Sequence, residues 1–351
     1  MRITYFLTTP RKSDPAREAV AQDIAALAAH VQAHPIHISP LQRIRPVVPE
    51  RLFGMWLIPQ IQSLNQHTDV FHICHDHPRF FTLLNLLRKP VVYSVTSGLR
   101  PHVPPNKAHL FNRLAQLTVS NARDLDRLNK WGIHNASVIR PAINLEKFAP
   151  LPALLADPRK PFHLFMASAP WTLYSFAHKG IDSLLSVMHA LPQLHITFLW
   201  RDFWYDEMLN RVRAHGLQDR TVVLNKKADV RTHLAQAHAA VLVADDGSVV
   251  KAYPNSLMEA IACARPVLIS QQIPMSDDVA AQGCGVVVPD IAPATLTSAI
   301  QEMMLNYPRY QQAAAAYPVQ QFSRQRWLDQ NLALYEAAVQ SSDLSGSAGR
   351  T

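Results

Sequence analysis

The chain has 351 residues, of which 48% are hydrophobic and 17% are charged. This composition excludes an intrinsically disordered chain and supplies enough apolar residues for the cores of two α/β domains. The net charge is +8, and the basic excess belongs to residues 1–150, which hold 18 Lys and Arg against 9 Asp and Glu. This asymmetry predicts that the first half meets an anion, such as a phosphorylated acceptor, an acidic membrane surface or a nucleic acid. A basic surface that only aids solubility is the alternative.

The sequence shows neither membrane-spanning nor disulfide signals. No apolar run approaches the roughly 20 residues that span a bilayer, and the start of the chain is too short for a signal peptide. The three cysteines lie far apart and form no C-x-x-C pair, which argues against a disulfide framework or a cysteine-rich metal site. We therefore expect a cytoplasmic protein.

Apolar, β-branched runs alternate with segments of helical period in both halves of the chain. This alternation predicts parallel sheets covered by helices, that is, an α/β fold. Asp14 and Pro15 have the pattern of an N-cap followed by proline at the first helical position. The face of this helix that we expect to be buried carries Val20, Ile24, Leu27 and Val31. The expected strands of the first half are residues 3–8, 35–38, 70–74, 91–95, 117–120 and 137–140.

A proline-rich stretch at residues 140–158 interrupts the periodicity and predicts a domain boundary. We expect domains at residues 1–150 and 151–322, a C-terminal helix at 323–340 and a disordered tail at 341–351. The expected strands of the second half are residues 162–167, 195–200, 221–224, 239–243, 267–269 and 286–288.

The segment at residues 241–270 has the pattern of strand, loop, helix and strand. Ser256 and Glu259 have the S-x-x-E spacing of a capping box, so we expect a helix start whose backbone N–H groups face an anion such as a diphosphate. A glutamate that only caps its helix is the alternative. In the preceding loop, Asp245 and Asp246 are candidate ligands of sugar hydroxyls, with an Asp-Gly-Ser turn as the alternative.

This segment resembles the retaining GT-B glycosyltransferases of family four, also called glycosyl transferases group 1. Their motif has two glutamates separated by seven residues and ends in E-A-x-A-C-G-x-P-V, whereas this chain has E-A-I-A-C-A-R-P-V at residues 259–267. The resemblance implies that Glu259 holds the ribose of a donor nucleotide by accepting from its vicinal hydroxyls. The first glutamate of the family corresponds to Lys251, which is a departure.

Further segments resemble the family in the same order along the chain, although the N-terminal half diverges more. They are D-V-F-H at residues 69–72, S-N-A-R-D-L at 120–125, the interdomain stretch at 138–150 and H-K-G-I-D-S-L-L at 178–185. The resemblance implies the GT-B fold, with two Rossmann-like, doubly wound parallel-sheet domains that face a central cleft. It also implies a C-terminal helix that packs back towards the N-terminal domain.

The resemblance implies that Lys179 neutralises the donor phosphates, with a solvated lysine at a helix start as the alternative. The arginine that the family has about five residues earlier is absent. Arg201 follows a predicted strand and would replace it, and Lys251 would join both cations around the diphosphate. An ion pair with Asp202 is the alternative for Arg201. The predicted donor-binding residues are Lys179, Gly180, Arg201, Tyr253, Pro254, Asn255, Ser256, Leu257 and Glu259.

His75 and His77 follow a predicted strand, where a cleft-facing loop would let either side chain orient an acceptor hydroxyl. We therefore predict that these histidines and Lys251 are the catalytic residues. A metal site that also includes His72 and Cys74 is disfavoured, because alternating residues of a strand face opposite ways. No metal ligand is predicted.

The resemblance implies transfer of a hexose-like unit from a nucleoside diphosphate sugar to an acceptor hydroxyl, with retention of anomeric configuration and without a cofactor or metal. The expected partners are the donor and a glycan, lipid-linked or small-molecule acceptor. No nucleic acid is expected, because the basic half lacks a recognisable reader motif. A catalytically inactive nucleotide-sugar or glycan-binding relative is the alternative, since the departures fall near the expected reaction centre.

Residues 41–58 mix basic and large apolar side chains. One interpretation is that they touch a lipid-linked acceptor or an anionic membrane, which would place the protein peripherally at the inner face of the membrane. The alternative is an amphipathic core helix that begins near Glu50.

Overall fold

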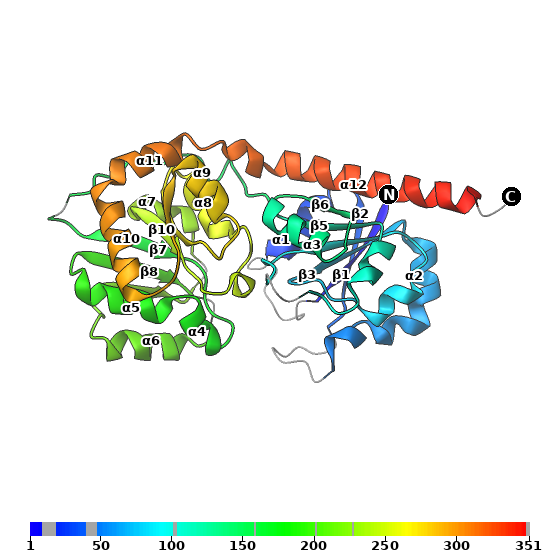
Figure 1. Ribbon diagram of the computed structural model, residues 1–351, viewed down its shortest axis with the longest axis horizontal. Helices are drawn as coiled ribbons and strands as arrows, with labels where there is room; N and C mark the ends of the chain where they lie inside the picture. Colours follow the sequence, from blue (N-terminus) through cyan, green and yellow to red (C-terminus); the bar gives the residue numbers. More distant parts are fainter. Residues whose placement is uncertain are drawn as a thin grey trace. The chain divides into compact units, whose positions relative to one another are not determined.

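The computed structural model describes residues 1–8, 19–39, 48–100, 104–157, 159–200, 202–226 and 228–348. The chain folds into two compact units (Figure 1). Unit 1 combines Met1–Pro141 with Gln325–Thr351, and unit 2 is Ala142–Arg324. Unit 2 begins before residue 150 because the Ile143 N–H donates to the Phe322 carbonyl at 3.0 Å and Phe148 packs in the core of unit 2.

Unit 1 contains a parallel sheet of six strands in the order β2-β1-β3-β4-β5-β6. The strands expected from the first half of the sequence are confirmed, with ends that differ by up to three residues. The strand order reverses between β1 and β3, so the loops after these strands meet at a topological switch point. The strands are β1 (Arg2–Leu7), β2 (Gln32–His37), β3 (Val70–His75), β4 (Val91–Val95), β5 (Gln116–Val119) and β6 (Ala136–Val138).

Mostly short helices connect the strands of unit 1. In α1 the predicted buried face is confirmed for Ile24 and Leu27, which belong to one core cluster with Ile3 and Tyr5 of β1. The N-cap expected at Asp14 lies outside the described residues. The elements are α1 (Ala19–Leu27), η2 (Glu50–Leu52), η3 (Met55–Gln60), α2 (Ile61–His67), η4 (Thr82–Leu86), η5 (Ala108–Arg113), α3 (Ala122–Lys130) and α12 (Arg324–Ala348).

The last helix, α12, runs along unit 1 in Figure 1. Its residues Leu328 and Tyr335 lie in the same core cluster as Ile3 of β1, which confirms a C-terminal helix that returns to the N-terminal domain. The helix continues to Ala348, past residue 340, so residues 341–348, which the sequence analysis expects to be disordered, are helical. Adding residues to an existing helix requires no new nucleus, which is why weak helix formers can extend it.

A chain of buried polar groups connects α12 with the sheet of unit 1. His72 Nδ1 lies 2.6 Å from the Tyr335 hydroxyl, and His72 Nε2 lies 2.7 Å from Ser94 Oγ. The Tyr335 hydroxyl also lies 3.2 Å from that of Tyr5, and Ser94 Oγ lies 2.7 Å from Thr118 Oγ1. Burial lowers the pKa of His72 to about 3, so this imidazole is neutral at pH 7.

Acid should weaken unit 1 through His72. A histidine whose pKa is lowered in the folded chain contributes stability that is present above its unfolded pKa of 6.5 and is lost as the pH falls towards about 3. Between pH 7.5 and pH 4.5 the free energy of unfolding should fall by about 3 kcal/mol. Hydrogen exchange of β3 and α12 peptides, corrected for intrinsic rates, measures this loss. His72→Gln keeps a neutral hydrogen-bonding side chain and should show a smaller pH dependence, whereas an equal dependence in both proteins would contradict this assignment.

Unit 2 contains a second parallel sheet of six strands, in the order β12-β11-β10-β7-β8-β9. This is the Rossmann order: the chain builds outward from β7 to β9 and then places β10 on the other side of β7. Each strand expected from the second half is confirmed to within one residue at either end. The strands are β7 (Phe162–Met166), β8 (Leu194–Leu199), β9 (Thr221–Leu224), β10 (Ala239–Leu242), β11 (Val267–Ser270) and β12 (Gly285–Val288).

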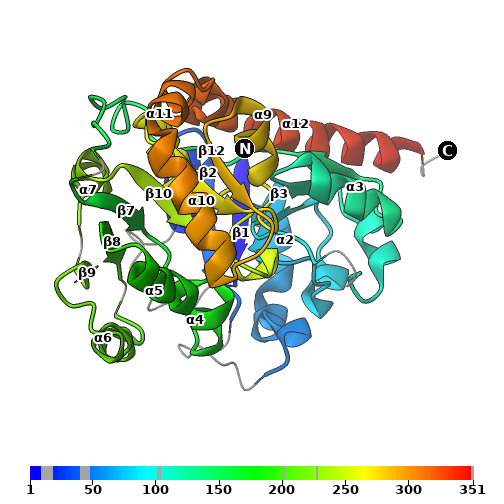
Figure 2. The ribbon, with the colours of Figure 1, turned by 60° about the vertical axis from the view of Figure 1, so that its left-hand side comes forward.

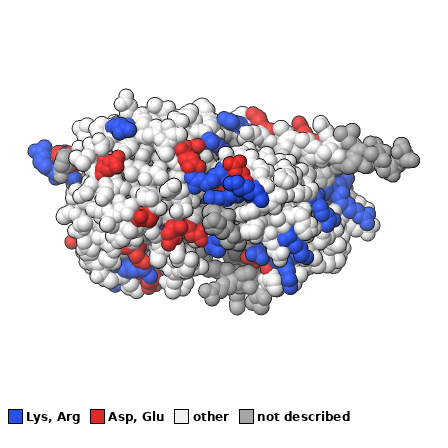
Figure 3. Space-filling view, in the orientation of Figure 1, with Lys and Arg blue, Asp and Glu red and all other residues white. Residues whose placement is uncertain are grey.

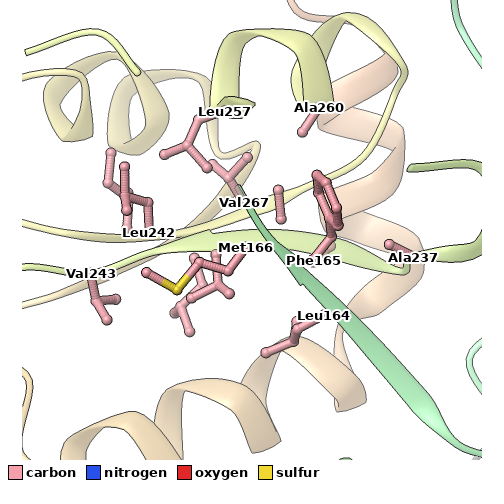
Figure 4. Packing of buried hydrophobic residues seen from close by; sticks show 14 of the residues in the cluster. Leu164, Phe165, Met166, Ala237, Leu242, Val243, Leu257, Ala260 and Val267 are labelled. Atoms are coloured by element: carbon pink, nitrogen blue, oxygen red, sulfur yellow. The ribbon is translucent and has the colours of Figure 1, made fainter. Parts of the chain in front are cut away.

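Helices cover the sheet of unit 2, and Figure 2 shows α5 and α10 side by side against it. On α8, Leu257 and Ala260 pack over β7 and β11, where Phe165 and Val267 are buried (Figure 4). This packing places the buried face of α8 against the sheet. The helical elements are α4 (Tyr174–His178), α5 (Ile181–Ala190), α6 (Tyr205–Ala214), α7 (Val230–Gln236), η6 (Gly247–Val249), α8 (Asn255–Ala262), α9 (Ser276–Gln282), α10 (Pro293–Leu305), α11 (Tyr307–Ala315) and η7 (Val319–Phe322).

The segment at residues 41–58 is described from residue 48 onwards. There it forms the 3-10 helices η2 and η3 rather than one amphipathic α-helix, because a glycine with a φ of 78° separates them. Phe53 and Leu57 are buried, whereas Trp56 and Ile58 are 41% and 45% exposed. Among the described helices, none is both long and apolar enough to cross a membrane.

Figure 3 draws the charged side chains on one face of unit 1. Figure 3 shows Lys and Arg side chains of this unit in separate groups on the face that it draws. Some of these side chains are held in ion pairs, such as Arg2 with Asp69 at 2.9 Å and Arg127 with Asp124 at 2.8 Å. Among the described residues on the drawn face, the Lys and Arg side chains of unit 1 form no single continuous patch.

Candidate functional site

Two loops of unit 2 follow the strands on either side of its topological switch point. The first follows β7 and leads into α4, and the second follows β10 and leads through η6 into α8. Ligands of open parallel sheets bind outside the carboxyl ends of the strands at this point. Lys179 and Gly180 lie between α4 and α5, and the predicted donor-binding residues from Tyr253 to Glu259 lie in the second loop or on α8.

Lys179 is buried just after α4. Only 4% of the residue is exposed, and its ammonium donates to Ser168 Oγ at 3.1 Å and to the Ala169 carbonyl at 3.3 Å. The alternative of a solvated lysine is therefore wrong. Because a buried ammonium pays a large desolvation cost, polar or anionic groups must surround it. Lys179 thus brings a fixed positive charge to the switch point.

The residues on either side of Lys179 attach it to the second loop. Gly180 has a φ of +61°, and a Cβ atom there would lie 2.5 Å from Val243 Cγ2. His178 Nδ1 lies 2.8 Å from both carboxylate oxygens of Asp245, whose own N–H donates to the His178 carbonyl at 3.2 Å. These contacts hold Lys179 in a defined position beside the loop after β10.

Alanine at position 180 should therefore disturb the site. The left-handed conformation and the close approach to Val243 together predict a loss of about 2 kcal/mol in the free energy of unfolding. Thermal or urea unfolding of Gly180→Ala measures the loss. Combining it with Val243→Ala should relieve the steric part, so the double variant should lose less than the sum of the two single variants. Strict additivity would argue against this contact.

The second loop turns at Asp246 and then presents Lys251. Asp246 Oδ1 accepts from the Ser248 N–H at 2.8 Å, which is the turn expected as the alternative to a sugar contact. Lys251 is partly exposed. Tyr253 is 2% exposed and its hydroxyl donates to Asp278 at 2.8 Å. This tyrosine therefore anchors the loop to α9 through its hydroxyl.

Helix α8 begins two residues before the capping box predicts, at Asn255 rather than at Leu257. Its N-cap is Pro254, and no side-chain hydrogen bond caps it, so the predicted pairing of Ser256 with Glu259 is wrong. The physical reason is that the Pro254 carbonyl accepts from the N–H groups of Leu257 and Met258, at 3.0 and 3.1 Å. Ser256 therefore lies inside the first turn rather than at its cap.

The first turn of α8 still suits an anion. Asn255 is its first residue, and Asn255 Oδ1, buried without a hydrogen-bond partner in the described part of the chain, can accept from a donor group of a ligand. The first N–H groups of a helix have no acceptor within the helix, and the helix dipole favours a negative charge beside them. The Leu257 side chain is in the core, so it can offer a ligand only its backbone. Glu259, partly exposed, lies one turn further along.

The end of α8 matches the glycine position of the family motif. Ala264 has a φ of 57°, its N–H donates to the Ile261 carbonyl at 2.9 Å, and the Arg265 N–H donates to the Ala260 carbonyl at 2.8 Å. This hydrogen-bond pattern is a Schellman motif, in which the left-handed residue is usually glycine. The chain therefore keeps the local geometry of the motif although alanine replaces its glycine.

Exposed aromatic rings stand at the carboxyl ends of β7 and β8, and the sequence analysis did not single them out. The rings of Trp171 and Phe203 lie 5.2 Å apart, and Trp204 Nε1 donates to the Trp171 carbonyl at 3.3 Å. Their exposed fractions are 41%, 38% and 42% for Trp171, Phe203 and Trp204. Such rings suit stacking on a nucleobase or a sugar. The sequence signal that could have indicated these rings is a tryptophan shortly after each of two predicted strands. Arg201, which was predicted to bind the donor, lies outside the described residues.

His75 and His77 lie at the carboxyl end of β3 in unit 1. His75 is 7% exposed, and its Nδ1 atom lies 2.9 Å from Thr8 Oγ1 and 3.0 Å from Asp76 Oδ1. Burial lowers the pKa of His75 to about 4. Burial alone would also lower the pKa of His77, but the neighbouring carboxylates of Asp76 and Glu50 raise it to about 9. Glu50 thus joins the two histidines, which no sequence pattern indicated.

The sequence of unit 2 matches a known family. Residues 175–317 match the family model described as Glycosyl transferases group 1. This segment is a glycosyl transferases group 1 domain. It runs from α4 past α11 and therefore includes Lys179, the second loop and the whole of α8. A search of curated proteins gave no significant match.

Solved structures share the architecture of the chain. A glycosyltransferase from Rickettsia africae ESF-5 aligns with a TM-score of 0.71 at 11% identity, over 96% of this chain and 99% of that one. Anabaena Alr3699/HepE in complex with UDP gives 0.70 at 14%, over 96% and 100%. WaaG, a glycosyltransferase involved in lipopolysaccharide biosynthesis, gives 0.60 at 14%, over 97% and 99%. The chain has the GT-B fold, as predicted.

Proposed function

We propose that this protein transfers a hexose-like sugar from a nucleoside diphosphate sugar to an acceptor hydroxyl, with retention of the anomeric configuration. The glycosyl transferases group 1 domain supports a transferase activity. The observation that carries the proposal is the ammonium of Lys179, which is buried where the loops after β7 and β10 are attached to each other. A fixed positive charge there would stabilise the nucleoside diphosphate as it leaves the sugar.

The proposed donor contacts all come from unit 2. Lys179 would face the diphosphate, and the N–H groups in the first turn of α8 would donate to it. Glu259 would accept from the ribose hydroxyls, as the family resemblance implies. Lys251 and Arg201 would add positive charge near the leaving group, so this site would not need a metal ion. The crystallised complex of the Anabaena protein with UDP supports a uridine nucleotide as the first donor to test.

The acceptor is proposed to be a glycan, a lipid-linked molecule or a small molecule, bound by a cytoplasmic protein. His75 and His77, at the carboxyl end of β3, would orient the acceptor hydroxyl. The exposed side chains of Trp56 and Ile58 favour peripheral contact with the inner face of a membrane. Flotation with anionic vesicles tests that contact, and failure of the protein to float with them would remove it.

A donor screen tests the function. The purified chain would be incubated with UDP-glucose, UDP-galactose, UDP-N-acetylglucosamine, GDP-mannose and the free nucleotides, with thermal stabilisation and nucleotide release as readouts. We expect one nucleotide sugar to raise the melting temperature and to be hydrolysed slowly without acceptor. The absence of stabilisation by any of them would overturn the proposed donor site.

The same screen distinguishes a catalytically inactive binding relative. The observation that favours this second candidate is that Lys251 stands where the family has a glutamate near the reaction centre. Such a protein would be stabilised by a nucleotide sugar and would release no nucleotide from it, even with acceptor mixtures. Release above the rate without protein would exclude it.

A further inference from the structure

Glu50, His75 and His77 come together at the carboxyl end of β3 in unit 1. One ligand atom of each side chain lies within 4.8 Å of those of the other two. His75 is the last residue of β3, His77 lies just beyond it, and Glu50 is contributed by η2. This is the side of the β1–β3 switch point where ligands of open parallel sheets bind.

Asp76 orients both imidazole rings in the same way. A single oxygen of its carboxylate, Oδ1, lies 3.0 Å from Nδ1 of His75 and 2.8 Å from Nδ1 of His77. A carboxylate accepts, so His77 Nδ1 carries a proton. His75 Nδ1 also lies 2.9 Å from Thr8 Oγ1, and because the Thr8 hydroxyl donates to the Cys74 carbonyl at 3.3 Å, this nitrogen carries a proton as well. The Nε2 atoms are the positions left for another partner. Histidines that bind metals are held in this manner, with the second nitrogen donating to a carboxylate.

The Nε2 atom of His75 is buried and has no hydrogen-bond partner within the described residues. The whole residue is only 7% exposed. A buried polar atom without a partner costs free energy, and in folded proteins it points to a bound group that satisfies it. This orphaned nitrogen is a second observation, beside the orientation of the rings, that points to a bound group.

The other two ligand atoms already face a cation. The guanidinium of Arg79 forms an ion pair with Glu50 Oε2, and its Nη2 atom lies 3.2 Å from His77 Nε2. His77 Nε2 and Glu50 Oε2 are 3.7 Å apart. Because the Arg79 side chain is 43% exposed, it can move into solvent. A divalent ion would replace it, together with any proton on His77.

We infer that Glu50, His75 and His77 form a binding site for a divalent transition-metal ion, of which zinc fits the donor set best. Two imidazoles and one carboxylate are typical zinc ligands. Bonds of about 2.0–2.2 Å bring ligand atoms to about 3.3 Å from one another, so small side-chain rotations close the site. Three protein ligands leave one position for water or for an oxygen of a bound molecule.

Zinc titration of the untagged full-length protein tests this inference. After chelator treatment and dialysis, calorimetry with ZnCl₂ should show one tight site, and CoCl₂ should give the visible absorption of a tetrahedral ion. Glu50→Gln and His77→Ala should each weaken zinc binding at least about 10-fold, and Asp76→Asn about 10–100-fold. His134→Ala removes an exposed histidine of unit 1 outside the cluster and should leave the affinity unchanged.

The variant Arg79→Ala distinguishes a metal site from a cluster of ion pairs that is only structural. If Arg79 competes with the metal, its removal should leave zinc binding equal or tighter. If the cluster is only structural, Arg79→Ala should lower the melting temperature and create no zinc affinity. Circular dichroism without metal checks that each variant is folded. The inference is overturned if the wild-type chain binds no more zinc than the Glu50→Gln/His77→Ala double variant. None of these readouts depends on sugar transfer, so the proposed function can fail independently.

Discussion

Replacement of Lys179 by methionine should reduce turnover of the nucleotide sugar by about 10²–10³-fold, the usual cost of removing one preorganised charge at a leaving group. Methionine retains the apolar stem and removes the ammonium that now donates to Ser168 and Ala169. Affinity for the free nucleoside diphosphate should fall as well, because the same charge faces the product. Nucleotide release under saturating donor and calorimetry with the nucleotide measure the two effects.

The melting temperature of Lys179→Met shows whether Lys179 has a catalytic or a structural role. Burying an ammonium carries a desolvation cost, so Lys179→Met should melt at or above the wild-type temperature if the charge serves the ligand. A lysine that only held its loop would show the reverse, with lower stability and turnover close to wild type. Lys147→Ala is the matched control, since this lysine lies in unit 2 in an exposed pair with Asp229. It should keep full turnover.

The strands of both sheets could be predicted because buried parallel strands are short continuous runs of apolar and β-branched residues. Val91–Val95 and Thr221–Leu224 were predicted with their observed bounds. Edge strands are harder to delimit: β2 contains histidines and a proline and begins three residues earlier than expected. The order of the strands follows from neither hydropathy nor length, and in the sequence analysis only the doubly wound arrangement was expected, from the family resemblance.

The site was predictable only where local spacing determines the geometry. The strand, loop and helix around α8 follow from the pattern, but the S-x-x-E spacing could not show that Pro254 takes the N-cap position. The burial of Lys179 depends on how the loop after β7 folds over it, which no local pattern encodes. Likewise, Glu50 meets His77 through tertiary packing across more than twenty intervening residues.

The burial of Arg265 could not be predicted from the sequence either, because arginine is usually exposed whereas here it is buried. It is 1% exposed, and its guanidinium donates to the Leu234 carbonyl at 2.9 Å and to the Pro152 carbonyl at 3.0 Å. Burial lowers the pKa of Arg265, so the fold carries a desolvation cost here. The side chain connects the start of unit 2 with the end of α7, just after the Schellman motif of α8.

Alanine in place of Arg265 should therefore lower the free energy of unfolding of unit 2 by about 4 kcal/mol. Two carbonyls would lose their donors and a large cavity would form, while relief of the buried charge offsets part of the loss. For a unit of this size the melting temperature should fall by roughly 8–16 °C. Differential scanning calorimetry measures the fall, with Arg159→Ala, at a 90% exposed side chain, as the control that should change little.

The loss of stability expected for Arg265→Ala should also affect binding of the donor nucleotide. If α8 presents its first turn to a diphosphate, loosening its far end should weaken nucleotide binding, because folding and binding draw on the same free energy. Saturating nucleotide should then restore part of the melting temperature of Arg265→Ala. A variant that melts like the wild type would show that the guanidinium contributes nothing net. A variant that is destabilised yet binds the nucleotide with unchanged affinity would show that the end of α8 acts independently of its start.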